Sequence, residues 1–269
     1  METDPLNPPS SAAKINTPSP SPSPSPPPVR SEIKQRDFLN HVESFLSKRD
    51  GIDKLLKISR YASKIIIASS ILPETLPITN RLKSFESSVG VSRKAFRLGK
   101  FIQDINALRN GCFHSNLDLI LSILAYGGEG IYYFIEQFIW LSKSGLIDPK
   151  LSRDLQKLSA CAELIGYVGS ISLKIRDLNE ISEEEIRIRS SVDVGMIRGE
   201  KCGELEEKIG KVKRKELMKK LSVIQDIADG LMAIADIRDV KGPLSGPLLL
   251  SSAGLLSAII SVHKNWLAC

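Results

Sequence analysis

The residues best suited to chemistry are two carboxylates, Glu129 and Glu136, within a largely apolar and aromatic segment from Leu117 to Leu141. Because they stand two helical turns apart, they share one face of a helix. Acidic side chains in such a segment usually face protein or water rather than lipid. We therefore consider a paired-carboxylate catalytic site or a polar path between helices, although no metal ligand lies nearby in the sequence.

Other residue types that support catalysis have no partners in the sequence. His41, His114 and His263 are isolated from one another, which favours packing or interface roles over metal binding. No nucleophile stands in a recognisable turn motif. The four cysteines are Cys112, Cys161, Cys202 and Cys269. Their spacing matches neither a metal site nor a disulfide framework, so we expect reduced thiols in a protein exposed to the cytosol. The sequence thus predicts a protein without catalytic, cofactor-binding or metal-binding residues, and not an enzyme.

The segment Gly127–Gly130 contains three glycines, a composition also found in phosphate-binding loops. Such a loop needs a preceding strand and a following cationic residue, and this segment has neither. It instead predicts a helix break or the close packing of helices through small residues.

A basic region precedes this segment. Residues 30–110 carry 16 Lys and Arg against 8 Asp and Glu, whereas the whole chain has a net charge of +6. Within residues 91–105, apolar residues recur at helical spacing and predict one membrane-binding face: Val91, Ala95, Leu98, Phe101, Ile102 and Ile105. The basic residues opposite or beside this face predict binding to anionic lipid: Arg93, Lys94, Arg97 and Lys100. Packing onto a helical bundle is the alternative. Nucleic acid is not expected, since no groove-reading module accompanies the charge.

The last part of the chain contains a stretch of 20 residues without charge, 243–262. As a helix it is about 30 Å long, which matches the hydrocarbon core of a bilayer. His263, Lys264 and Trp266 follow directly and are typical of the headgroup layer. The stretch therefore predicts a transmembrane helix, and a buried helix of a soluble core is the alternative. A third apolar run, Ser159–Leu173, contains Glu163 as its only charge and is a weaker candidate for membrane entry.

From these patterns we predict an all-α, membrane-associated protein with amphipathic interfacial helices and at least one C-terminal transmembrane helix. An apolar content of 42% is too low for a polytopic transporter. We divide the chain into a Ser/Pro-rich leader (1–30), a basic amphipathic region (31–110), an apolar helical region (111–175), a charged linker (176–220), and an amphipathic helix followed by the terminal span (221–269). Helix breaks are expected at Asp50–Gly51 and at Pro73–Pro77.

The leader has ten prolines in residues 1–29 and no apolar run, so we expect it to be disordered and without a secretory signal. Four Ser-Pro repeats predict proline-directed phosphorylation at Ser19, Ser21, Ser23 and Ser25, with a purely solubilising role as the alternative.

Three segments resemble, in order and spacing, the motifs of the peroxin-11 family of peroxisomal membrane proteins: Arg49–Lys64, Gly127–Leu141, and Ile227–Arg238 with the terminal apolar segment. The Ser/Pro leader departs from that family's short N-terminus. The resemblance implies a protein that elongates and tubulates the peroxisomal membrane through a basic amphipathic helix, which maps by position onto 82–105. It also implies cytosolic termini, association with itself or related members, and recruitment of a dynamin-related fission GTPase with its tail-anchored adaptor.

Import by the peroxisomal membrane-protein receptor is a further implication, for which we predict a basic targeting cluster: Lys211, Lys213, Arg214, Lys215, Lys219 and Lys220. Two other functions remain open. One is a small-solute pore with Glu129 and Glu136 along its path, and the other is a tail-anchored helical scaffold for protein interactions.

Overall fold

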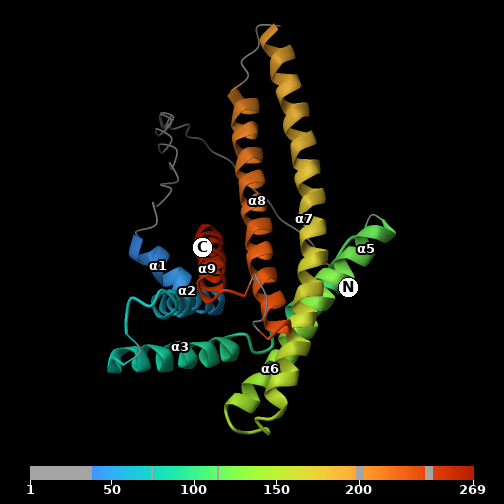
Figure 1. The fold of residues 1–269 in the computed structure, drawn as a ribbon. Helices are drawn as coiled ribbons and strands as arrows, with labels where there is room; N and C mark the ends of the chain where they lie inside the picture. Colours follow the sequence, from blue (N-terminus) through green and yellow to red (C-terminus); the bar gives the residue numbers. More distant parts are fainter. Residues whose placement is uncertain (1–37, 74, 114, 198–202, 240–244) are drawn as a thin grey trace, which may run out of the picture. The chain divides into compact units, whose positions relative to one another are not determined.

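A computed structural model of the chain describes residues 38–73, 75–113, 115–197, 203–239 and 245–269. Within these ranges all regular structure is helical, which confirms the all-α prediction (Figure 1). The leader and its four serines lie outside the described residues. The helices are α1 (Phe38–Ser47), α2 (Arg49–Ala68), α3 (Pro77–Phe96), α4 (Phe101–Asn110), α5 (Asn116–Ser122), the π-helix η1 (Ile123–Gly127), α6 (Gly128–Lys143), α7 (Leu151–Ile197), α8 (Gly203–Ile237) and α9 (Pro247–Leu267).

The two longest helices, α7 and α8, lie side by side in antiparallel order (Figure 1). α6 packs against α7, while α9 packs against both α2 and α8. The region expected to be a charged linker forms the adjoining ends of α7 and α8. Its charged side chains make pairs one helical turn apart, such as Arg189 with Glu185 and Lys211 with Glu207, and such pairs stabilise exposed helices.

The interior of the described structure contains many polar and charged side chains beside apolar ones, while many large apolar side chains are exposed on its surface. Charged residues from five helices are buried: Asp53, Lys57, Arg93, Asp104, Glu136, Asp226 and Asp229. Large apolar residues are about half exposed, among them Ile165 and Val168 on α7 and Leu256 and Ile259 on α9. Water-soluble proteins bury charge only rarely and expose no large apolar patches. This arrangement instead suits an environment in which lipid covers the outer surface.

Two described helices are long and apolar enough to cross a membrane, Leu151–Val194 and Pro247–Leu267. The second contains most of the predicted terminal span, whose residues 243 and 244 lie outside the described ranges. The first contains the weaker candidate run, 159–173. In the segment 117–141, α5, the π-helix η1 and α6 follow one another without a break.

The prediction of one continuous helix through residues 91–105 is wrong. α3 ends at Phe96 and α4 begins at Phe101, and Gly99 between them has a φ of 72°. This left-handed conformation interrupts a helix and is easily adopted only by glycine. The Arg49 guanidinium donates a hydrogen bond of 2.8 Å to the carbonyl oxygen of Leu98 and holds the turn. The predicted apolar face is therefore divided between two helices.

The first helix break falls at Lys48 rather than at Asp50–Gly51. Gly51 lies within α2, where the backbone carbonyl of Phe45 approaches too closely to leave room for a Cβ atom. The aromatic ring of Trp266 packs against Phe38, His41 and Phe45 of α1. Trp266, predicted to mark a headgroup layer, thus also fastens α1 to the end of α9.

Candidate functional site

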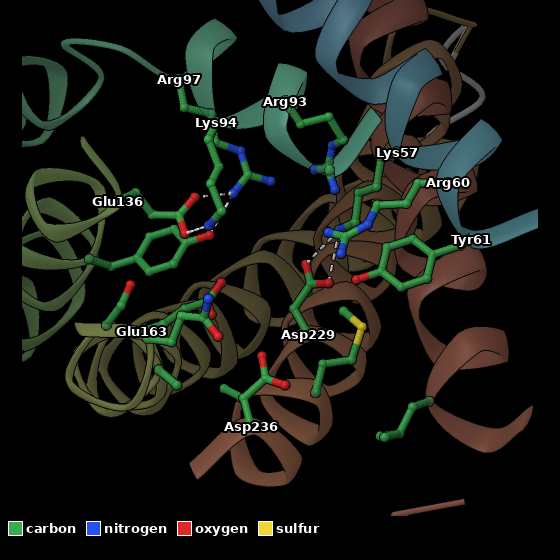
Figure 2. Close-up of a pocket in the computed structure, with 18 of the residues that line it drawn as sticks. Lys57, Arg60, Tyr61, Arg93, Lys94, Arg97, Glu136, Glu163, Asp229 and Asp236 are labelled. Carbon is green, nitrogen blue, oxygen red and sulfur yellow. Dashed lines mark hydrogen bonds and ion pairs between the residues drawn. The ribbon is translucent and has the colours of Figure 1, made fainter. Parts of the chain in front are cut away.

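A cavity of about 770 Å³ lies among α2, α3, α6, α7, α8 and α9. Among the described residues, its lining contains twelve Lys and Arg side chains and seven Asp and Glu side chains. Figure 2 shows side chains from α2 and α3, including Lys57, Arg60 and Arg93, pointing towards carboxylates of α6 and α8. The cavity is therefore both strongly charged and positive on balance.

On α2, Asp53 is the centre of an ion cluster. It accepts a hydrogen bond of 3.0 Å from Nε of Arg93, and Nε of Arg97 lies 3.7 Å away. Nζ of the neighbouring Lys54 lies 3.3 Å from its other oxygen. Burial on its own raises the pKa of Asp53, but the positive charges of Arg97 and Arg93 outweigh it and hold this pKa well below its usual range.

Glu136 on α6 is the centre of a second ion cluster. It pairs with Nζ of Lys94, and Nη1 of Arg97 lies 3.5 Å away (Figure 2). The same Arg97 nitrogen donates to the hydroxyl of Tyr132 at 2.5 Å. Burial raises the pKa of Glu136, yet Lys94 and Arg97 more than compensate, so its net pKa is lowered. Arg97 thus connects the Asp53 and Glu136 clusters.

Glu129 has a different partner, since it accepts a hydrogen bond of 3.0 Å from the hydroxyl of Tyr133. The two predicted carboxylates both line the cavity, and each has its own partner: the Tyr133 hydroxyl for Glu129 and Lys94 for Glu136. Among the described residues, no group of three His, Cys, Asp or Glu side chains is placed to hold a metal ion.

A third ion pair crosses the cavity from α2 to α8. Nζ of Lys57 lies 2.9 Å from Oδ1 of Asp229 and donates to Oγ of Ser257 on α9 at 2.6 Å. Nearby, Asp226 of α8 pairs with Lys174 and accepts a hydrogen bond from Ser170 at 2.8 Å. α8 therefore turns two buried aspartates inward.

The residues predicted to bind anionic lipid occupy inward positions. Arg93 is 4% exposed, and Lys94 and Arg97 are paired with Asp53 or Glu136 as described above. Lys100 lies 3.9 Å from Asp50 and 4.7 Å from the centre of the Tyr133 ring. Of the predicted apolar residues, Leu98, Ile102 and Ile105 are about half exposed, while Val91, Ala95 and Phe101 are partly covered. Lipid binding by either set stays a prediction.

The predicted targeting cluster lies on α8, outside the cavity. Lys213, Arg214 and Lys215 are exposed, whereas Lys219 pairs with Asp177 of α7 at 2.5 Å. His41, expected to have a packing role, donates through Nε2 to the carbonyl oxygen of Trp266 at 2.9 Å.

Sequence reasoning missed the part of the site that α2 supplies. Asp53, Lys57 and Arg60 recur at spacings of four and three residues, and Lys64 continues the pattern, so they form one charged face of that helix. This spacing was visible in the sequence. Its significance was not, because a charged helix face usually points to solvent.

The α4 residue Asp104 gives a prediction about pH. Its side chain is buried, and Oδ2 has no hydrogen-bond partner among the described residues. Burial and, secondarily, the negative charge of Glu129 raise the pKa of Asp104 to about 7. The folded state therefore holds this proton more tightly than the unfolded chain. The resulting stabilisation is complete below the usual aspartate pKa and is lost as the pH rises through about 7.

We accordingly expect Asp104→Asn to increase the free energy of unfolding at pH 8. A pKa raised from 3.8 to about 7 corresponds to about 4 kcal/mol at about 1.4 kcal/mol per pKa unit, and solvent screening lowers the expected gain to about 2 kcal/mol. At pH 4 the variant and the natural protein should unfold at nearly the same temperature. Thermal unfolding of the detergent-solubilised proteins between pH 4 and 8 measures the difference in stability at each pH. An equal difference between the two proteins at every pH would contradict the assignment.

The chain is similar to one family of known proteins over most of its length. Residues 39–266 match the family model described as peroxisomal biogenesis factor 11 (PEX11). Over 236 residues the chain is 65% identical to Peroxisomal membrane protein 11A of Arabidopsis thaliana, covering 88% of this chain and 95% of that protein. It is 52% identical to Peroxisomal membrane protein 11-3 of Oryza sativa subsp. japonica, covering 87% and 91%, and 26% identical to Peroxisomal membrane protein PMP30B of Candida boidinii, covering 88% and 98%. No solved structure matches the chain.

Proposed function

Because this chain belongs to the peroxisomal biogenesis factor 11 family, we propose that it elongates and tubulates the peroxisomal membrane, and so promotes peroxisome proliferation and fission, without catalysing a reaction. The observation that carries the proposal is the combination of family membership with an apolar outer surface. Residues such as Ile165 on α7 and Ile259 on α9 are about half exposed on the two candidate spans. A lipid environment would cover them.

The proposed deformation uses the exposed residues of the α3–α4 region, Leu98, Ile102 and Ile105, which we call the α4 apolar face. Shallow insertion of this face into one leaflet would expand that leaflet and favour curvature. Attraction of Arg93, Lys94 and Arg97 to anionic lipid is part of the same proposal. In the described conformation these cations are held by carboxylates of α2 and α6, so their contribution requires α3 to move away from both helices.

The candidate spans among the described residues are α7 and α9. We propose that both ends of the chain face the cytosol. The proposed partners are another copy or a related family member, and a dynamin-related GTPase with its tail-anchored adaptor. For the import receptor, the exposed side chains of Lys213, Arg214 and Lys215 supply an accessible basic surface.

We expect the full-length protein to stay in the membrane pellet when isolated peroxisomes are washed with alkaline carbonate. The physical reason is that α9, an apolar helix of 21 residues, can cross the hydrocarbon core. A change in the charge of the protein is not enough to extract such a helix. A soluble matrix protein, released in the same wash, is the control. Recovery of the full-length chain in the supernatant would overturn integral insertion.

A solute pore is the second candidate function, and the cavity of about 770 Å³ is the observation that favours it. The test is efflux of small solutes from liposomes containing the purified protein. Efflux that is reduced by Glu129→Gln would favour a pore. Tight liposomes that nevertheless form tubules would favour membrane deformation.

A further inference from the structure

One end of the cavity carries more positive than negative charge. We define the α2–α3 basic cluster as the five cations around the Asp53 and Glu136 clusters: Lys54, Arg93, Lys94, Arg97 and Lys100. Three described carboxylates lie within ion-pairing distance of them, namely Asp50, Asp53 and Glu136. The Asp50 side chain is 46% exposed, so its charge is screened by solvent and salt. The cluster therefore has an excess of at least two positive charges.

Arg93 is the member of this cluster that most needs another partner. The residue is 4% exposed and lines the cavity. Its Nε donates to Asp53, but its buried Nη2 has no hydrogen-bond partner among the described residues. A buried charged donor without an acceptor is costly, and native proteins rarely retain one without a reason. Figure 2 shows the Arg93 guanidinium facing the space that Lys57 and Arg60 also face.

Lys54 gives independent support for the excess of positive charge. Its ammonium has one neighbouring carboxylate, Asp53 at 3.3 Å, which already interacts with Arg93 and Arg97. Burial lowers the pKa of Lys54 to about 8. Asp53 acts in the opposite direction, but Lys100, Arg97 and Lys57 lower the pKa further. The surroundings of Lys54 are thus those of a site lacking an anion.

We propose that the cavity binds a phosphate monoester, with its dianionic phosphate seated on the α2–α3 basic cluster. A phosphate monoester supplies two negative charges and three oxygen acceptors, whereas a carboxylate supplies one charge and two acceptors. Arginine side chains suit such an anion because their planar guanidinium groups donate to two oxygens at once. The phosphate would accept from Nη2 of Arg93 and pair with Lys54.

The cavity is large enough for more than the phosphate group. Its volume of about 770 Å³ falls in the usual range for small-molecule sites, about 300 to 1,000 Å³. Lys64 lines the same cavity with a side chain that is 37% exposed, so the cavity reaches solvent on that side. The phosphate can belong either to a soluble metabolite or to a lipid headgroup. The α4 apolar face contributes none of these groups, although Arg93, Lys94 and Arg97 also belong to the lipid contact proposed above.

The test uses full-length protein in two settings. In detergent, thermal unfolding is followed with inorganic phosphate or glycerol 3-phosphate, and with sodium chloride at matched ionic strength. In nanodiscs, unfolding is compared between phosphatidylcholine alone and phosphatidylcholine containing phosphatidic acid. Arg93→Lys retains a charge for Asp53 but removes Nη2. Lys54→Gln removes a cation whose ion-pair partner among the described residues is Asp53. Lys208→Gln, which removes an exposed cation on α8, is the matched control.

We expect phosphate, but not chloride, to raise the unfolding temperature, and we expect Arg93→Lys to weaken the apparent affinity at least tenfold. Lys54→Gln should weaken it several-fold, while Lys208→Gln should leave it unchanged. An Arg93-dependent effect in detergent supports a soluble ligand, and one seen only with phosphatidic acid supports a lipid headgroup. The proposal is overturned if no phosphate probe stabilises the protein in either setting. It is also overturned if folded Arg93→Lys and Lys54→Gln proteins respond as the natural protein does.

Discussion

Replacement of Gly169 by valine is expected to prevent α7 from packing against α5 and η1 and to destabilise the whole helical assembly. A Cβ atom at this position would lie 2.8 Å from the carbonyl oxygen of Leu121 and 2.9 Å from the carbonyl carbon of Leu124. Both atoms belong to the backbone, so no side-chain rotation can relieve the overlap. We expect a loss of about 3 kcal/mol or more, because the usual cost of overpacking, about 1 to 3 kcal/mol, assumes that the neighbouring atoms can move aside. Thermal unfolding and size-exclusion chromatography after detergent extraction measure it.

Gly210 provides the matched control for this substitution. It lies within α8, where a Cβ atom would meet nothing within 4 Å. Gly210→Ala should therefore stabilise the protein by about 0.5 to 1 kcal/mol, because alanine loses less conformational entropy than glycine in a helix. Equal stability of the Gly169→Val and Gly210→Ala proteins would show that the close helix contact is absent from the folded protein in detergent.

The substitution Ile102→Glu is expected to abolish tubulation of liposomes by the full-length protein. Ile102 belongs to the α4 apolar face and is 52% exposed, so glutamate at this position should not disturb the fold. Burial of an isoleucine side chain contributes about 1.5 to 3 kcal/mol to insertion, and the variant loses this contribution. Insertion of the variant must also desolvate a carboxylate, which is a further cost. Since about 1.4 kcal/mol corresponds to a factor of ten, membrane insertion of α4 should weaken by tenfold or more.

The neighbouring substitution Gln103→Glu adds the same charge to an exposed position of α4 outside the apolar face, and tubulation should persist. Tubules are counted by electron microscopy of liposomes containing equal amounts of each protein, with helicity checked by circular dichroism. If Ile102→Glu tubulates as well as Gln103→Glu does, the α4 apolar face is not the element that bends the membrane.

The sequence predicted the parts of this structure that depend on neighbouring residues. The Gly127–Gly130 cluster was expected to permit close helix packing, and a Cβ atom on Gly128 would indeed lie 2.5 Å from the backbone nitrogen of Gly166. Helical periodicity likewise indicated the all-α fold and the terminal apolar helix. These features follow from local spacing and residue size, which a single sequence displays directly.

The charged interior could not be predicted in the same way. Arg93 and Lys94 read as the basic side of an interfacial helix, but their partners Asp53 and Glu136 are 40 and 42 residues away. No local pattern indicates which distant carboxylate a cation will meet. The Gly99 turn was missed for a related reason: an isolated glycine is tolerated within a helix, so its effect depends on tertiary contacts such as that of Arg49 with Leu98.

In the proposed membrane orientation, the length of the α7–α8 pair determines how far its tip lies from the bilayer surface. α7 has 47 residues and is about 70 Å long, more than twice the roughly 30 Å of a hydrocarbon core. Lys264, near the end of α9, hydrogen-bonds Gln225, and the Asp177–Lys219 pair comes directly beyond that level. With α9 in the bilayer, as proposed, the charged half of the hairpin would stand on the same side as the C-terminus. There it would form a spacer that keeps any protein bound at its tip, or any apposed membrane, tens of ångströms from the headgroups.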